Sequence, residues 1–236
     1  MQATGSNSQP NKQSIRISTD GLSFYAQGER RDIGFAHKDE RFLRAMSYCL
    51  CAPELAEIAA DTQITLCCPM ATPLPNDLFD NRQAAEILGM QYPKAKGMVC
   101  RTTRTDYGTT VAFAVPEEFD RFLTENYPQA DIRHCDAGRI GQVLLESKTG
   151  NAPYIRIYTE GDRSCLVAAC QGQLQLCNRY DTPEASDTLY FLAEFCDQLH
   201  WSQTETRIAC DEACAARPLI AERFRHCETF SSTLCE

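Results

Sequence analysis

The stretch SIRISTDG, residues 14–21, is echoed later in the chain by YIRIYTEG, residues 154–161. The triplet Ile-Arg-Ile at 15–17 recurs at 155–157, and one residue after each triplet come a Thr, an acidic residue and a Gly. Alternating apolar and polar residues predict a strand, and an acidic residue before Gly is typical of a hairpin turn. The echo therefore has two interpretations, namely chance or the duplication of one folding unit.

The segments after each copy follow the same order, which favours duplication. The first copy predicts three strands, a helix that Pro53 interrupts, and a further strand, at residues 14–19, 22–27, 32–36, 39–53 and 62–68. The second copy predicts strands at 154–159, 164–169, 173–178 and 204–210, with a helix before the last strand that Thr182 caps and Pro183 opens. Aligning Leu66 with Ile208 gives an offset of 142 residues, close to the 140 that separate Ile15 from Ile155. We therefore expect an α/β (α+β) fold in which a β-β-β-α-β unit occurs twice.

Between the copies lies an insertion with its own helices and hairpin. We expect a helix at 75–89 that Asn76 or Asp77 caps and Gly89 ends, a hairpin at 98–103 and 109–115, a helix at 116–127, a strand at 131–135, and a helix at 138–147 that crosses between the halves. The segment 217–230 predicts a helix and a terminal strand. The predicted organisation is a flexible tail at 1–13, a first half at 14–136 and a second half at 137–236.

Composition narrows the class of protein. The chain of 236 residues has a formal net charge of -9 and a pI near 5.0, which argues against a nucleic-acid groove because phosphate binding needs clustered Lys and Arg. No apolar run approaches the roughly 20 residues that span a bilayer, and the polar start is unlike a secretory signal. We expect a cytoplasmic protein whose fourteen cysteines are reduced thiols, many of them packed as small apolar residues.

A duplicated three-strand, helix, strand unit is similar to the actin-like fold, in which two ribonuclease-H-like halves face each other across a cleft. The segment QLQLCNRYDTPEASDTLYFLAEFCDQL, residues 173–199, further resembles an uncharacterised family from Bacteroidetes. That family has an actin-like ATPase fold and is similar in outline to PilM-type pilus assembly proteins. The resemblance runs from SIRISTDGLSF to RFRHCETF, and it implies a fold without implying an activity.

In actin-like ATPases, a hairpin turn of each half holds phosphate and Mg²⁺ through Asp, Gly and hydroxyl groups. The resemblance therefore gives as candidate cofactor-binding residues Asp20, Gly21, Ser23, Glu160, Gly161 and Asp162. Both turns depart from the ATPase pattern, because Asp20 directly precedes Gly21 and no two of the twelve glycines are adjacent. The chain also has no GxxxxGK[ST] loop. The competing interpretation is that both acidic-Gly pairs only form hairpin turns, as such pairs commonly do.

Other chemistry-bearing patterns are weaker. Asp136, Gly138 and Gly141 in CDAGRIG spell Asp-x-Gly-x-x-Gly, which as a phosphate loop would need a hairpin after it. The residues 143–145 favour a helix instead, so Asp136 is expected to cap that helix. We predict no metal site, because the chain lacks CxxC and a zinc site from Cys210 and Cys214 with His226 would depend on a favourable fold. No GxSxG-like motif accompanies the histidines, so they are expected to be packed or on the surface. Strand parity sends Arg16 and Arg156 to the face opposite their Ile neighbours, where we expect solvent.

Three functional hypotheses follow. The first is a non-catalytic actin-like scaffold or adaptor that acts through a protein partner and needs no cofactor. The alternative is an ATPase or sugar-kinase-like phosphotransferase that binds ATP and Mg²⁺ in the cleft, with Asp20 and Ser23 near a phosphate and Glu160 or Asp162 near the metal. The third is a redox sensor, which predicts a fast-reacting cysteine.

Overall fold

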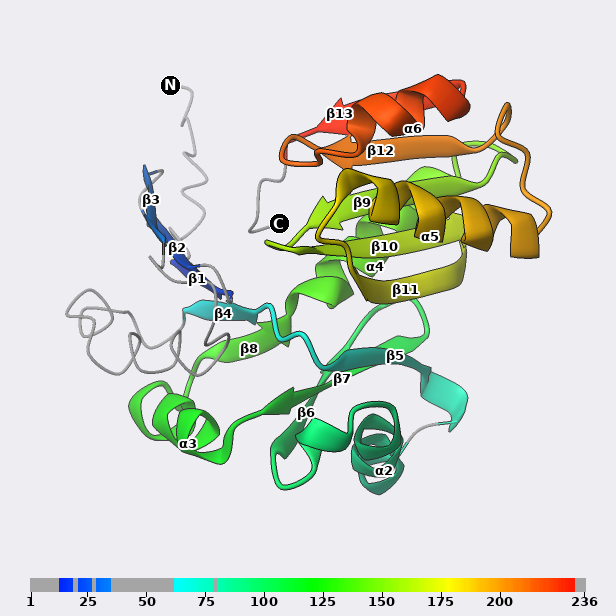
Figure 1. Cartoon of the computed structure of the whole chain (residues 1–236). Coiled ribbons are helices and arrows are strands. Elements are labelled where there is room, and N and C mark those ends of the chain that lie inside the picture. The colour runs from blue at the N-terminus through cyan, green and yellow to red at the C-terminus, as the bar shows by residue number, and fades with distance from the viewer. Residues whose placement is uncertain (1–12, 19–20, 27–28, 35–61, 79, 232–236) are drawn as a thin grey trace, which may run out of the picture.

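Two five-stranded sheets with the same strand order form the body of the protein (Figure 1). The computed structural model describes residues 13–18, 21–26, 29–34, 62–78 and 80–231. The first sheet has the order β3-β2-β1-β4-β8, from strands β1 Ser14–Ile17, β2 Gly21–Ala26, β3 Glu29–Gly34, β4 Gln63–Leu66 and β8 Asp131–His134. The second has the order β11-β10-β9-β12-β13, from β9 Tyr154–Thr159, β10 Arg163–Cys170, β11 Gln173–Asp181, β12 Arg207–Asp211 and β13 His226–Phe230.

The pairing pattern confirms the duplication predicted from the echo. In both sheets the first strand of the unit pairs antiparallel with the second strand and parallel with the fourth. The alignment of Leu66 with Ile208 is wrong by two residues, since Ile15 pairs with Ile64 and Ile155 pairs with Ile208. A shift of two residues keeps the same side chains on the same face, which is why the misalignment left the predicted faces unchanged.

Helices pack on both faces of the second sheet. On the outer face, Ile155 and Leu166 pack against α5 (Ala185–Gln198) and α6 (Arg217–Arg223). On the inner face, Tyr154 and Val167 belong to the same core cluster as apolar residues of α4 (Cys135–Ser147), the helix that leads from the first half into the second (Figure 1). The boundary predicted after residue 136 falls in the first turn of this helix.

The start predicted for the helix before β12 is wrong. We expected Thr182 as its cap and Pro183 as its first residue, whereas α5 begins at Ala185 with Glu184 as N-cap. Glu184 and Asp187 form a reciprocal capping box, in which each side chain accepts from the other residue's backbone N–H. This pair satisfies two amides at the helix start, which accounts for the later beginning.

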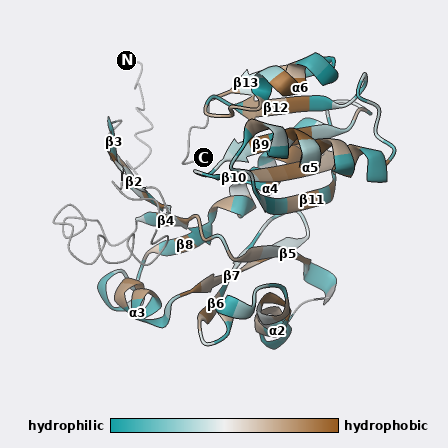
Figure 2. Cartoon of the chain, viewed as in Figure 1, coloured by the Kyte–Doolittle hydropathy of each residue, from teal (hydrophilic) through white to brown (hydrophobic). Residues whose placement is uncertain are grey.

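The insertion forms a third sheet of order β5-β7-β6 with helices beside it, from β5 Ala71–Pro75, β6 Val99–Arg104, β7 Thr109–Val115, α2 Asn81–Gln91, α3 Glu117–Asn126 and the 3-10 helices η2 Asn76–Leu78 and η3 Pro93–Ala95. All seven residues of the central strand β7 are buried, and Figure 2 shows its apolar colour. Strand β5 was not predicted because its two prolines argue against a strand. They are tolerated here because β5 is an edge strand.

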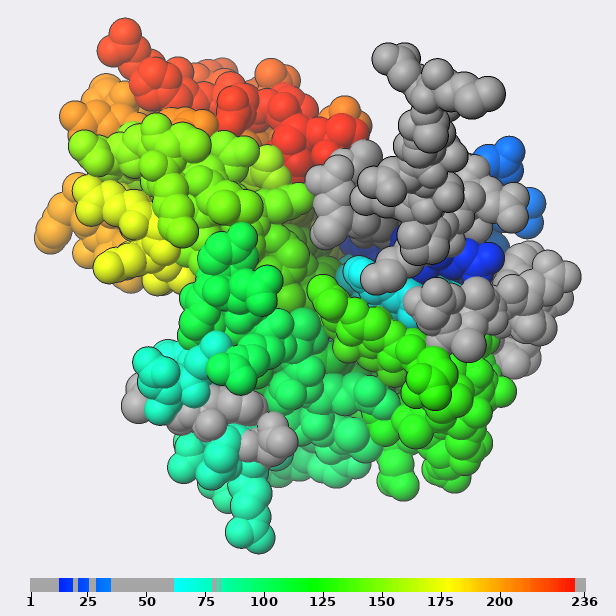
Figure 3. All heavy atoms as spheres, turned by 180° about the vertical axis from the view of Figure 1, so that it is seen from behind, coloured from blue at the N-terminus to red at the C-terminus, as the bar shows by residue number. Residues whose placement is uncertain are grey.

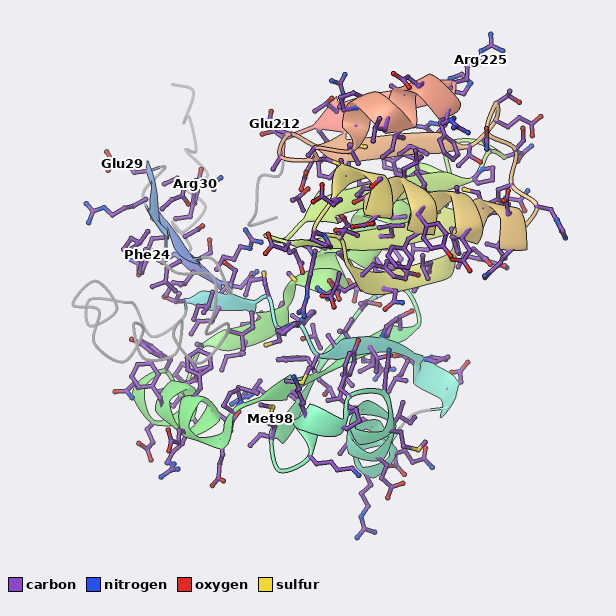
Figure 4. All side chains as sticks on the ribbon, viewed as in Figure 1. Phe24, Glu29, Arg30, Met98, Glu212 and Arg225 are labelled. Atoms are coloured by element: carbon purple, nitrogen blue, oxygen red, sulfur yellow. The ribbon has the colours of Figure 1, made fainter. Side chains whose placement is uncertain are left out.

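The predicted limits of the helix at 75–89 are also wrong. The Asp80 carboxylate caps α2 by accepting from the backbone N–H groups of Arg82 and Gln83, both at 2.8 Å. Asn76 and Asp77 instead belong to η2, and α2 continues through Gly89. Met98, labelled in Figure 4, packs with Leu88 and the other residues that join this helix to β6.

Several predictions concern residues outside the described ranges. These are the tail at 1–12, the helix expected from 39 to Pro53, and Asp20 in the first turn. At the outer edge of the first sheet, Glu29 and Arg30 of β3 point to opposite sides of the strand, Glu29 away from the rest of the protein (Figure 4). Among the described helices, none is long and apolar enough to cross a membrane.

Candidate functional site

The second candidate turn is a tight hairpin between β9 and β10. The N–H of Glu160 donates to the carbonyl oxygen of Arg163 at 2.8 Å, and the reverse bond is 3.3 Å long. Gly161 has a φ of 63°, in the left-handed region that favours glycine. Hairpin geometry therefore accounts for Gly161 without a bound phosphate.

The first candidate turn is also explained by close packing. Ser18 donates from its N–H and its hydroxyl to the carbonyl oxygen of Gly21, at 3.0 and 2.9 Å. A Cβ atom at Gly21 would overlap the carbonyl oxygen of Ile33 on β3. Ser23 lies within β2, paired with Arg16 on one side and Asp32 on the other. The structure thus places Gly21 and Ser23 in the sheet, while Asp20 lies outside the described residues.

Glu160 is bound by two buried arginines. Arg179 on β11 donates from Nε to Oε2 of Glu160 at 2.8 Å, and Arg139 on α4 donates from one terminal nitrogen to Oε1. The two arginine side chains are 5% and 6% exposed, and that of Glu160 is 12% exposed. The carboxylate proposed for Mg²⁺ therefore already has two guanidinium partners.

Asp136 completes this ion-pair network, which we define as Asp136, Arg139, Glu160 and Arg179. Arg179 binds both oxygens of Asp136, with two parallel bonds of 2.7 Å, the bidentate geometry that makes such pairs strong. The expectation that Asp136 caps α4 is wrong. The cap is His134, whose Nδ1 accepts from the Asp136 N–H at 3.2 Å, while its Nε2 lies 3.1 Å from the carbonyl oxygen of Cys68.

The network keeps both carboxylates ionised. Burial alone would raise the pKa of Glu160, but the Arg179 and Arg139 guanidiniums lower it to about 2. The same kind of competition, between burial and the charges of Arg179, His134 and Arg139, lowers the pKa of Asp136. Burial lowers the pKa of His134 to about 4, against the attraction of the Asp136 carboxylate, so this histidine is neutral at physiological pH. The prediction of a packed histidine is confirmed for His134, which is 1% exposed.

Thiols lie next to the network. The hydrogen bond with the Cys135 thiol lowers the pKa of Cys67 to about 6 against the effect of burial, with help from the charges of Arg16 and Arg139. Reaction with a dissolved oxidant also needs access, and Cys67 is buried. The eleven cysteines among the described residues are all free thiols.

Two groups of three residues bring metal-ligand atoms within 4.8 Å of one another, and both contain Asp136. One group adds His134 and Cys135, and the other adds Cys165 and Cys177. In each group the Asp136 carboxylate is bound to Arg179 on both oxygens. A cation would have to displace a buried guanidinium to use it, so neither group is arranged to receive one.

A polar pocket of about 730 Å³ lies between the inner faces of the two halves. This inter-half pocket is lined by residues that include Arg16, Thr65, Tyr107, Gln142, Arg156 and Phe230. Figure 3 shows this side of the molecule from behind, where the cyan of β4 lies against the greens of the residues beyond 130. The expectation that solvent alone surrounds Arg16 is wrong, because Arg16 is 9% exposed and lies at this pocket.

Sequence reasoning identified one member of the network as a candidate site residue, Glu160, and noted Asp136 for a different role. Arg139 and Arg179 were missed as site residues. Each is a single arginine in a helix or strand pattern, and only the fold brings them together from positions 40 residues apart. For Arg16 and Arg156, the shared Ile-Arg-Ile pattern was a usable signal, because it places both arginines on equivalent faces of the two sheets.

Two sheets of the same order, joined by a crossing helix, define the class of actin-like ATPase folds. A Bacteroides thetaiotaomicron protein with an actin-like ATPase fold and unknown function has a TM-score of 0.82 to this chain, at 17% identity, covering 98% of this chain and 94% of the other. A chain of the PilM-PilN type IV pilus biogenesis complex has a TM-score of 0.50 at 9% identity, covering 93% and 88%.

The chain belongs to the family described as "Protein of unknown function (DUF3822)", which matches residues 2–211. A comparison with curated proteins found no match. These comparisons confirm the resemblance and the fold expected from the sequence.

Proposed function

We propose that this protein is a non-catalytic actin-like scaffold or adaptor that acts through a protein partner. The observation that carries the proposal is the binding of Glu160 by Arg139 and Arg179. An ATP site in this fold needs a carboxylate that can hold hydrated Mg²⁺ near the phosphates. In this chain the corresponding carboxylate is neutralised by buried arginines.

The conformation of the turns supports the same proposal. Gly161 is required by its positive φ, and Gly21 by the close approach of β3. A phosphate contact is therefore not needed to explain why glycine occupies either position. Folding requirements alone therefore explain the two glycines among the candidate cofactor-binding residues.

A protein partner is the second part of the proposal. PilM, whose fold this chain shares, is found in a complex with PilN. A preserved duplicated fold without an available Mg²⁺ carboxylate suits a protein that positions a partner.

Thermal unfolding with and without nucleotide tests the proposal. We expect no change in Tm when Mg-ATP, Mg-ADP or a panel of sugars is added at up to millimolar concentration, because a ligand that binds only the folded state would raise Tm. An active actin-like ATPase, measured in parallel, verifies that the assay detects nucleotide. A reproducible rise that disappears in Asp20→Ala and in Glu160→Gln would instead support the alternative, an ATPase or sugar-kinase-like phosphotransferase using ATP and Mg²⁺.

A further inference from the structure

Arg16 and Arg156 occupy equivalent positions in the two copies and line the same pocket. Arg16 lies between Ile15 and Ile17 on β1, and Arg156 has the same place on β9. The inter-half pocket is lined by both, so duplication has placed one arginine on each of its two main walls. In a chain with a net charge of -9, this concentration of arginine needs a reason.

Arg16 is a buried cation without a carboxylate partner among the described residues. Its Nε donates to the Cys67 sulfur at 3.0 Å, and no ion pair joins it to Asp or Glu within the described ranges. The Cys67 thiol, whose pKa is lowered to about 6, supplies negative charge on that side of the guanidinium. No carboxylate binds Arg16 directly within the described ranges, so an anion in the pocket would add an oxygen acceptor to this buried cation.

Among the described residues, the groups that bind Arg156 are neutral. Its Nε donates to the Tyr154 hydroxyl at 3.0 Å and one terminal nitrogen donates to Gln142 Oε1 at 2.9 Å. Its guanidinium lies 4.4 Å from the centre of the Phe230 ring. These contacts hold the side chain in place and leave its charge uncompensated within the described part of the chain.

Two other arginines of the pocket have carboxylate partners, and a third has none among the described residues. Arg133 is bound by Asp131 at 2.6 Å, and Arg139 is bound by Glu160 and Asp136 in the ion-pair network. Arg104 lines the pocket and has no ion pair with a described residue. Among the described residues, the positive charge of the pocket without an ion-pair partner therefore comes from Arg104 and Arg156, with Arg16 bound to the Cys67 sulfur beside them and the carboxylate of Asp106 opposing them.

Neutral donors and aromatic walls complete the pocket. Thr65 is the direct neighbour of Arg16 across β1 and β4, so its hydroxyl lies on the same face. Tyr107 and Phe230 supply apolar surface. The volume of about 730 Å³ falls in the range of about 300–1,000 Å³ typical of small-molecule sites.

We propose that the inter-half pocket binds a small organic phosphate, with the phosphoryl oxygens accepting from Arg16, Arg156 and Thr65 and the organic part against Tyr107 and Phe230. A tetrahedral phosphoryl group offers acceptors in several directions, which suits donors from two walls, whereas a carboxylate offers two coplanar oxygens. This site is separate from the candidate nucleotide turns, because neither Gly21 nor the segment 160–162 lines it. The proposal goes beyond the scaffold function and does not depend on it.

Calorimetric titration of the full chain with inorganic phosphate and with glycerol phosphate tests this site, at constant ionic strength set with NaCl. We expect saturable binding that weakens at least tenfold in Arg156→Gln and in Arg16→Gln. The matched control is Arg207→Gln, an arginine stacked 4.9 Å over Tyr154 on the same sheet but outside the pocket, which should bind as the wild type does. Far-UV circular dichroism and Tm of each variant verify folding, and Arg156→Gln decides the result if Arg16→Gln does not fold.

Three outcomes would overturn the proposal: no saturable binding, equal affinity in Arg156→Gln and Arg207→Gln, or tighter binding of citrate or a glutamate-rich peptide than of either phosphate. A nucleotide arm separates this proposal from the scaffold function. Binding of Mg-ATP that is lost in Glu160→Gln but kept in Arg156→Gln would contradict the scaffold function. The phosphate titrations of the arginine variants would still decide whether the inter-half pocket binds phosphate.

Discussion

A single side chain, Arg179, connects three parts of the second half. From β11 it binds both oxygens of Asp136 at the start of α4 and also Glu160 in the β9–β10 turn. Its side chain is 5% exposed, so these bonds form with little competition from water. The cluster consists of buried ion pairs in which each charge is compensated by its neighbours.

Replacing Arg179 by Met should strongly destabilise the protein. The change leaves the Asp136 and Glu160 carboxylates with only Arg139 to compensate two buried charges, and breaking a buried pair from one side costs about 3–5 kcal/mol. Urea unfolding followed by circular dichroism measures the free energy of unfolding. Arg207→Met is the control, because its nearest carboxylate, Glu228, is 4.0 Å away and exposed, and exposed pairs contribute about 0–1 kcal/mol. A loss below 1 kcal/mol in Arg179→Met would contradict a stabilising network.

At the scale of elements, residue patterns identified most strands and helices but misplaced some of the residues at which they begin and end. The alternation in β9 and the apolar stripe of α3 follow directly from local sequence. Strand β5 was missed because proline disfavours strands, and only its edge position makes proline acceptable. The beginning of α2 was misplaced because several polar residues before it could act as a cap, and the fold selects Asp80.

Gly21, the first residue of β2, provides a test of how closely β2 packs against β3. Gly21→Ala should destabilise the protein by about 1–3 kcal/mol, since the added methyl group would overlap the backbone carbonyl of Ile33, which cannot rotate away. Thermal unfolding measures the loss. The matched control is Gly34→Ala, because Gly34 pairs directly with Gly21 and a Cβ atom there would meet nothing within 4 Å. Equal effects of the two substitutions would show that β3 does not pack as described.

For the whole molecule, the sequence predicted the duplication and the fold, whereas the central site required the structure. The Ile-Arg-Ile echo placed Arg16 and Arg156 on matching faces. The alternation of side chains along a strand predicts on which face of the sheet a residue lies, but it does not predict what packs on that face. In the structure the inner faces of the two sheets lie against α4 and the opposing half. The ion-pair network could not be predicted from the sequence either. Asp136 and Arg179 are distant in the chain, and only the packing of α4 against β11 brings them into contact.

Acid should destabilise the whole molecule in two stages. In the unfolded chain His134 takes up a proton near pH 6.5, whereas in the folded protein burial delays this to about pH 4. The unfolded state therefore binds more protons between these values, and stability falls as pH decreases, by about 3 kcal/mol from this group. Glu160 and Asp136 have lowered pKa values in the folded state, so their contribution is complete above about pH 4.5 and is lost as pH falls towards 2.

Urea unfolding at a series of pH values separates the two stages. In His134→Gln the decline between pH 6.5 and pH 4 should largely disappear, because glutamine does not titrate, while the loss below pH 4.5 should persist. His226→Gln on β13, an exposed position, is the control and should follow the wild-type profile. A wild-type profile that is flat from pH 6.5 to pH 4 would mean that His134 is protonated in the folded protein. Its Nδ1 could then no longer accept from the Asp136 N–H, and the N-terminal cap of α4 would have to be formed by another group.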